Sequence, residues 1–109
     1  MKFKIGQEIE VTEDFELIGG LSGDKIEVKK GDTGFIDSNG SIHYQTGKAR
    51  GKIHKLTDAE IKGYDTGNIA KIAYKYLERH FNIREYLEDY EIEEAEFIDE
   101  LDYILSEIL

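Results

Sequence analysis

The sequence predicts an α+β protein with a strand-rich first half and a helical second half. Short segments of alternating polar and apolar residues recur through residues 1–56, and this period of two is typical of strands. After residue 66, apolar residues recur every three or four positions, which indicates helices. Ten of the eleven glycines lie in residues 1–63. We therefore expect two domains, a small β-barrel at residues 1–56 and an acidic helical region at residues 57–109 packed on it.

Five alternating segments are the expected strands of the barrel. They are residues 8–12, 25–29, 33–37, 41–46 and 49–56. Asn39 and Gly40 separate the third strand from the fourth, and this dipeptide is typical of a hairpin turn. A glycine-rich loop is expected at residues 19–23. Five short strands favour a curled antiparallel sheet, whose closure would remove exposed edges.

The segment KIEVKKGDTGFI, residues 25–36, carries a short motif in which a strand is followed by Lys-Gly-x-x-Gly and an apolar pair. Gly31 and Gly34 are its glycines, and Phe35 and Ile36 are its apolar pair. The segment resembles the core of KOW-type and related SH3-like barrels. The resemblance implies a five-stranded SH3-like barrel, but such barrels bind RNA, peptides or other proteins, so it implies a fold more than a function.

Two or three helices are expected after the barrel. Thr57 and Glu60 have the spacing of a capping box and predict a short helical turn that ends before Gly63. The next helix is expected at residues 67–81, capped by Asp65 or Thr66. Further apolar stripes predict helices at residues 83–90 and 97–108, with a break near residues 90–93.

The last expected helix has an apolar seam of coiled-coil spacing, formed by Phe97, Leu101, Ile104 and Ile108. Fewer than two heptads are present, so we expect this seam to pack on the other helices or on the barrel. A dimer through the same seam is the alternative, and we expect a monomer or a dimer.

The formal charge of −10 lies entirely in the second half of the chain. Residues 1–56 hold nine basic and nine acidic side chains, whereas residues 57–109 hold five basic and fifteen acidic ones. Phosphates would be repelled by the second half. Its expected binding face, with Tyr86, Tyr90 and Tyr103 interleaved, is formed by Glu85, Glu88, Asp89, Glu93, Glu96, Asp99, Glu100 and Asp102.

Acids on the last helix lie three to five residues apart, or roughly 4.5–7.5 Å along a helix axis. This spacing is similar to that of phosphates along a nucleic-acid strand. The last turn holds Glu107 and no base, although acids at a helix C-terminus oppose the helix dipole. This arrangement indicates a use of the charge in binding, whereas the interpretation that the sequence slightly favours is that the charge only keeps the protein dispersed.

A basic stripe is expected on the barrel. Lys48, Arg50 and Lys52 are spaced by two and would share one face of a strand, with Lys29 and Lys30 nearby. The stripe can be interpreted as a surface for nucleic acid or for an acidic protein. The alternative interpretation is the solvated face of an edge strand, where lysines discourage aggregation.

Several kinds of chemistry have no support in the sequence. The chain has no cysteine, and His43, His54 and His80 lack metal-ligand spacing. No phosphate-binding Gly-Lys-Ser/Thr loop is present. We therefore expect no catalysis, no cofactor and no metal. The absence of a long apolar segment favours a cytoplasmic protein that does not enter a membrane.

The expected function is that of an interaction protein whose acidic helices bind a basic surface of a nucleic-acid-binding protein. In style the chain resembles small nucleic-acid-mimic inhibitors carried by phages and other mobile elements, including anti-CRISPR proteins. One alternative is an accessory barrel that binds nucleic acid and is regulated by its acidic tail. Another is a structural homo-oligomer held by salt-sensitive contacts.

Overall fold

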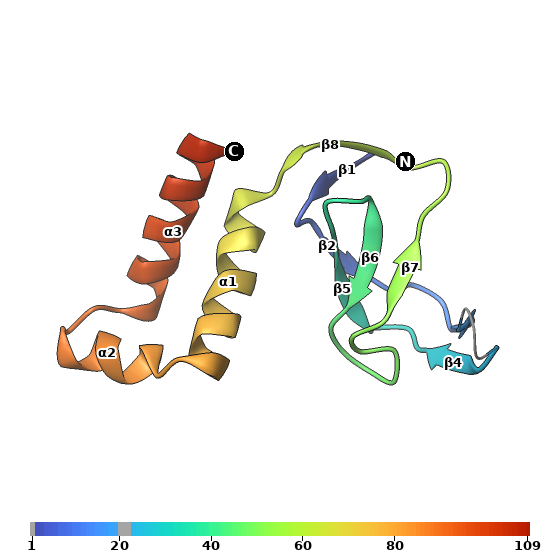
Figure 1. Cartoon of the computed structure of the whole chain (residues 1–109), viewed down its shortest axis with the longest axis horizontal. Coiled ribbons are helices and arrows are strands. Elements are labelled where there is room, and N and C mark those ends of the chain that lie inside the picture. Colours follow the sequence, from blue (N-terminus) through green and yellow to red (C-terminus); the bar gives the residue numbers. More distant parts are fainter. Residues whose placement is uncertain (1, 20–22) are drawn as a thin grey trace. The chain divides into compact units, whose positions relative to one another are not determined.

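The protein has an α+β fold, seen in a computed structural model that describes residues 2–19 and 23–109 (Figure 1). Within these residues there are eight strands and three helices. The chain forms two compact units, Met1–Gly63 and Tyr64–Leu109, which we call the strand unit and the helical unit. Residues 20–22 of the expected glycine-rich loop lie outside the described residues.

The strand unit contains three small sheets. The largest has the order β2-β5-β6-β7, β1 pairs with β8, and β3 pairs with β4. The expected five-stranded SH3-like barrel is not confirmed, because the described strands form separate sheets and no closed barrel. The strands are β1 (Lys2–Ile5), β2 (Glu8–Glu10), β3 (Phe15–Ile18), β4 (Lys25–Val28), β5 (Thr33–Ile36), β6 (Ser41–Tyr44), β7 (Ile53–Lys55) and β8 (Glu60–Tyr64).

The helical turn expected from Thr57 is wrong, since Glu60 begins strand β8 instead. Asp58 has a positive φ of 58°, which interrupts any helix at this point. Pairing with β1 then supplies partners for the β8 backbone. The first part of the expected helical region, residues 60–64, is therefore a strand.

The hairpin expected at Asn39 and Gly40 is confirmed between β5 and β6. The Asp37 carboxylate accepts hydrogen bonds from the backbone N–H groups of Asn39, at 2.8 Å, and Ser41, at 2.9 Å. Gly40 takes the positive φ of 78° that the turn requires. This turn places β5 and β6 side by side over the core, which is formed by Val11, Val28, Ile36, Ile42, Tyr44 and Ala49.

The helical unit is formed by α1 (Thr66–His80), α2 (Ile83–Asp89) and α3 (Glu94–Ile108). The Asp65 side chain caps α1 by accepting a 3.0 Å hydrogen bond from the N–H of Asn68. The chain breaks after α2, as expected. Figure 1 shows α1 and α3 side by side, with α2 joining them at one end.

The apolar seam of α3 packs on α1 through its N-terminal part. The ring of Phe97 meets the buried ring of Tyr74 edge-on, with centroids 5.9 Å apart. Farther along α3, Ile104 is exposed and Ile108 is 73% exposed. The seam is therefore covered at its start and open at its C-terminal end.

Candidate functional site: an acidic helical surface

The eight expected binding acids lie on α2, on α3 and on the connection between them. We call them the acidic surface. Seven of the eight are exposed, and the exception is Asp102, which is half-buried. Helical geometry places Glu96, Asp99 and Glu100 on neighbouring positions of α3. Their carboxylates consequently face water near one another.

The acidic surface is not neutralised by bases of the same chain. Across the described residues, none of its eight acids lies within 4.0 Å of a lysine or arginine nitrogen. Arg84 is instead held at 2.7 Å from Glu78 and 3.9 Å from Glu94, two acids outside this set. The helical unit has thirteen acidic and four basic residues, so the charge stays unbalanced.

Asp102 differs from the other acids because its carboxylate is engaged inside the unit. It accepts a 2.6 Å hydrogen bond from the hydroxyl of Thr66, at the start of α1. Glu85 has a local contact too, since it accepts a hydrogen bond from the side-chain amide of Asn82. The geometry therefore gives Asp102 a structural role and leaves the remaining acids directed to solvent.

Exposed aromatic rings accompany the acids. Tyr86 and Tyr90 lie one helical turn apart with ring centroids separated by 4.7 Å. Their side chains are 51% and 65% exposed, and Tyr103 on α3 is exposed as well. Tyrosine is enriched at protein interfaces because it combines a large apolar surface with a polar end. The acidic surface thus contains groups suited to contact a protein.

The basic stripe does not lie along one strand as expected. Residues 48–51 form a turn, and β7 begins only at Ile53. Backbone hydrogen bonds close the turn, from the N–H of Arg50 to the carbonyl of Gly47 and from the N–H of Lys52 to the carbonyl of Ala49, and Ala49 is fully buried in the core. The prediction that Lys48, Arg50 and Lys52 share one face of a strand is therefore wrong.

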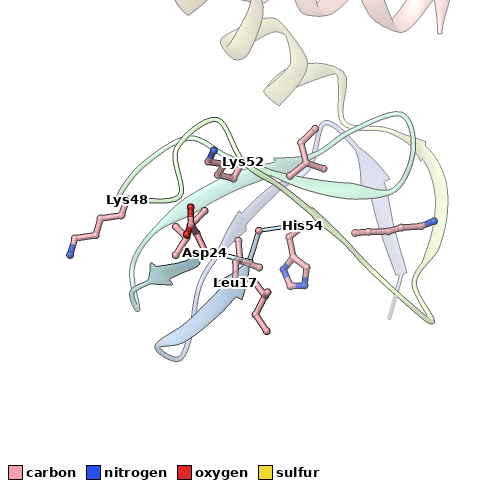
Figure 2. A pocket seen from close by; sticks show the side chains of 10 residues that line it. Leu17, Asp24, Lys48, Lys52 and His54 are labelled. Carbon is pink, nitrogen blue, oxygen red and sulfur yellow. The ribbon is translucent and has the colours of Figure 1, made fainter. Parts of the chain in front are cut away.

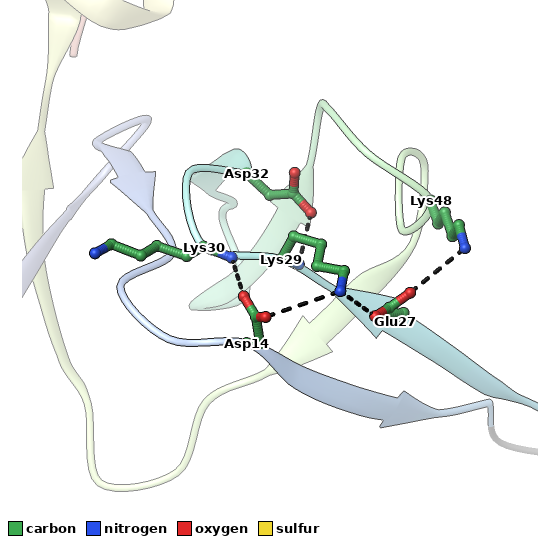
Figure 3. Close-up of polar contacts among 6 residues, drawn as sticks. All are labelled: Asp14, Glu27, Lys29, Lys30, Asp32 and Lys48. Carbon is green, nitrogen blue, oxygen red and sulfur yellow. Dashed lines mark hydrogen bonds and ion pairs between the residues drawn. The ribbon is translucent and has the colours of Figure 1, made fainter.

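Two cations of the expected stripe are paired with Glu27, as Figure 3 shows. Lys29 contacts this carboxylate directly and also lies 3.8 Å from Asp14, while Lys48 lies 3.4 Å from Glu27. The hydrogen bond from Lys29 lowers the pKa of Glu27, and the same contact raises the pKa of Lys29. Lys30 is anchored through its backbone N–H, which donates to Asp14 at 2.7 Å.

The strand unit has an open groove that the sequence did not reveal. The groove has a volume of about 650 Å³ and lies between the β3–β4 hairpin and β7 (Figure 2). Its cationic side chains include Lys48, Lys52 and Lys55. It is built from segments about 30 residues apart, so only the tertiary structure brings its residues together.

The described residues provide no cluster of three or more histidine, aspartate or glutamate side chains able to hold a metal ion. No helix in residues 2–19 and 23–109 is long and apolar enough to cross a bilayer. No protein-family model, no curated protein and no solved structure matches the chain. The functional argument consequently depends on the residues and their geometry.

Proposed function

We propose that this chain is a non-catalytic interaction protein whose acidic surface binds a basic, nucleic-acid-binding surface of another protein. The observation that carries the proposal is the set of exposed carboxylates on α2 and α3 without intramolecular ion pairs. Exposed charge of one sign steers an oppositely charged partner and favours a complementary interface. The partner's nucleic acid would compete for the same surface.

The arrangement of charges supports mimicry of a phosphate backbone. Glu96, Asp99 and Glu100 project from the first half of α3, where the rise is about 1.5 Å per residue, and Glu93 is the N-cap residue of this helix. Their separation along the helix is comparable with that of successive phosphates. An inhibitor of this type, including the phage anti-defence proteins that the chain resembles in style, acts by occupying the groove that would hold nucleic acid.

The helix energetics also support a use for the charge. Glu107 lies in the last turn of α3, where no basic residue is present. An exposed acid at that end costs about 0.3–1 kcal/mol through the helix dipole. A sequence selected only for stability would favour a base there.

Affinity capture with immobilised full-length protein tests the proposal. A nuclease-treated lysate is passed over wild-type protein, and bound proteins are released with increasing salt or with duplex DNA. We expect nucleic-acid-binding proteins that leave the column at moderate salt, since exposed ion pairs are screened. Duplex DNA should release the same proteins at constant ionic strength.

Two variants make this experiment specific. The first replaces Glu93, Glu96, Asp99 and Glu100 by their amides, and the matched control neutralises four exposed acids of the strand unit: Glu8, Glu10, Glu13 and Glu60. Both variants lose the same charge. Capture should fall only in the first. Equal capture by both variants, or partners that DNA does not displace, would overturn the proposal.

The alternatives have less support. Nucleic-acid binding by the strand unit needs unpaired cations, but Lys29 and Lys48 are paired with Glu27. A closed SH3-like barrel remains a proposal for the fold of the strand unit. A homo-oligomer held by salt-sensitive contacts remains a proposal for the function of the chain. The oligomer would be detected by light scattering at low and high salt.

A further inference from the structure

The strand unit contains a groove whose two sides belong to different sheets. One side is formed by the β3–β4 hairpin with Leu17, Ile18 and Ile26, and the other is formed by β7 with Ile53, His54 and Lys55. Figure 2 shows Leu17 near His54, with Lys52 farther along and Lys48 extending outward from the far end. About 650 Å³ lies within the usual range for ligand sites, about 300–1,000 Å³.

Strand β7 is the last strand of its sheet, and no strand within residues 2–19 and 23–109 pairs with its other edge, which lies beside the groove. The N–H of Tyr44 donates to the carbonyl of Lys52 at 3.1 Å. Hydrogen-bonded pairs alternate with non-bonded pairs along an antiparallel ladder. His54 is therefore bonded to Ile42, while Ile53 and Lys55 direct their backbone N–H and C=O groups away from β6.

Three consecutive residues of β7 line the groove. Consecutive side chains point to opposite faces of a strand, so this pattern indicates that the edge of β7, rather than one of its faces, borders the groove. An unpaired edge is a template on which an extended chain can form backbone hydrogen bonds. Ile53 is 59% exposed and Ile18 is 73% exposed, so aliphatic side chains of such a chain would find apolar partners on both sides.

The charge of the groove selects between possible occupants. Its described lining contains two lysines without an ion pair, Lys52 and Lys55, together with Lys48, which is paired with Glu27, and one acid, Asp24. Lysines beside an aliphatic floor suit a chain that alternates acidic and aliphatic side chains. Single-stranded nucleic acid is less suited, because bases bind by stacking on aromatic rings, and the described lining has one ring, His54, beside four leucine and isoleucine side chains.

We propose that the groove binds an extended, acidic–aliphatic peptide of another protein, which adds as a strand to the edge of β7. Backbone hydrogen bonds to Ile53 and Lys55 would hold the peptide in register. Alternate aliphatic side chains would enter the groove between Ile18 and Ile53. The acidic side chains, on the opposite face of the added strand, would meet Lys52, and Lys55 would add to the positive charge of the groove. This inference is independent of the acidic surface.

A fluorescent hexapeptide of alternating glutamate and isoleucine is the probe, titrated with full-length protein and followed by anisotropy. We expect saturable binding that weakens with salt. A peptide of alternating lysine and isoleucine should not bind. The same glutamate–isoleucine peptide with alternate backbone amides N-methylated keeps its side chains and should bind at least about tenfold more weakly, because it cannot complete the ladder.

The protein variants separate the groove from general charge. Lys52→Glu combined with Lys55→Glu should weaken peptide binding about tenfold or more. The matched control, Lys2→Glu with Lys62→Glu, changes the same charge at exposed positions of the same unit outside this groove and should leave affinity within about twofold. Ile53→Thr should weaken binding while circular dichroism shows an unchanged fold.

Three results would overturn the inference. The N-methylated peptide could bind as well as the parent, the two charge variants could weaken binding equally, or a labelled oligonucleotide could bind the groove in a Lys52-dependent manner while the peptide does not. Self-association that is lost in the Lys52/Lys55 variant, without peptide binding, would also overturn it and would assign the groove to a second copy.

Discussion

The hydroxyl of Thr66, the first residue of α1, donates a 2.6 Å hydrogen bond to the carboxylate of Asp102 on α3. The two residues are 36 positions apart in the sequence, and their contact fastens the start of α1 to the C-terminal half of α3. It also removes one carboxylate from the acidic surface.

Thr66→Val should lower the free energy of unfolding by about 1–2 kcal/mol, because it leaves a half-buried carboxylate without its donor. Urea denaturation followed by circular dichroism measures the change. Glu100→Gln, on the exposed side of the same helix, is the control and should have little effect. If Thr66→Val unfolds at the wild-type urea concentration, the bond does not contribute to stability.

Arg84 bridges the three helices through Glu78 of α1 and Glu94 of α3, and the contact raises the pKa of the guanidinium through its hydrogen bond to Glu78. Arg84→Gln should lower the free energy of unfolding only slightly, because the pair is exposed to solvent. The loss should shrink in high salt. Lys71→Gln changes the same charge at an exposed position of α1 outside these ion pairs, and a loss equal to that of Arg84→Gln would contradict a specific role for the bridge.

Tyr74 is buried against Phe97, and both burial and the nearby carboxylate of Glu94 raise the pKa of its phenol. Because this pKa is raised in the folded state, the neutral phenol contributes its full stability below about pH 10, the ordinary tyrosine pKa. That contribution is lost as the pH rises through the folded-state pKa. Tyr74→Phe should reduce the alkaline loss of stability, measured by urea denaturation from pH 8 to 11. Tyr103→Phe, at an exposed site, should not.

Gly34 lies where β5 and β6 approach closely, and an added Cβ would fall 2.4 Å from the backbone oxygen of His43. Gly34→Ala should therefore destabilise the strand unit by at least about 1–3 kcal/mol, through a backbone clash. Gly67→Ala, in α1, is the control, because a Cβ there would lie at ordinary contact distance from the carboxylates of Asp65 and Asp102. It should raise stability by about 0.5–1 kcal/mol. Thermal unfolding of both variants would show whether their signs are opposite.

Glu107 is the acid in the last turn of α3. Glu107→Gln should raise the free energy of unfolding by about 0.3–1 kcal/mol by removing an unfavourable interaction with the helix dipole. Glu93→Gln makes the same change at the N-cap and should not stabilise the protein. Lower stability of Glu107→Gln would indicate that the residue has a favourable contact in solution and would weaken the argument that its charge is kept for binding.

Local patterns in the sequence determined much of this protein. The turn between β5 and β6 depends on Asp37, Asn39 and Gly40, and the N-terminal cap of α1 depends on Asp65. These contacts join residues only a few positions apart, so the local sequence determines them. The three helices follow from apolar periodicity. The position of the acidic residues on α2 and α3 follows from the same periodicity.

The tertiary structure decided what depends on distant partners. Residues 60–64 satisfy their backbone by pairing with β1, which overrides the helical signal at Thr57. Residues 48–51 form a turn in place of the expected basic strand, and Glu27 pairs with Lys29 and Lys48 of the expected stripe. The groove beside β7 and the engagement of Asp102 by Thr66 also join remote segments. Local propensity cannot encode such contacts, since each depends on where two separate parts of the chain meet.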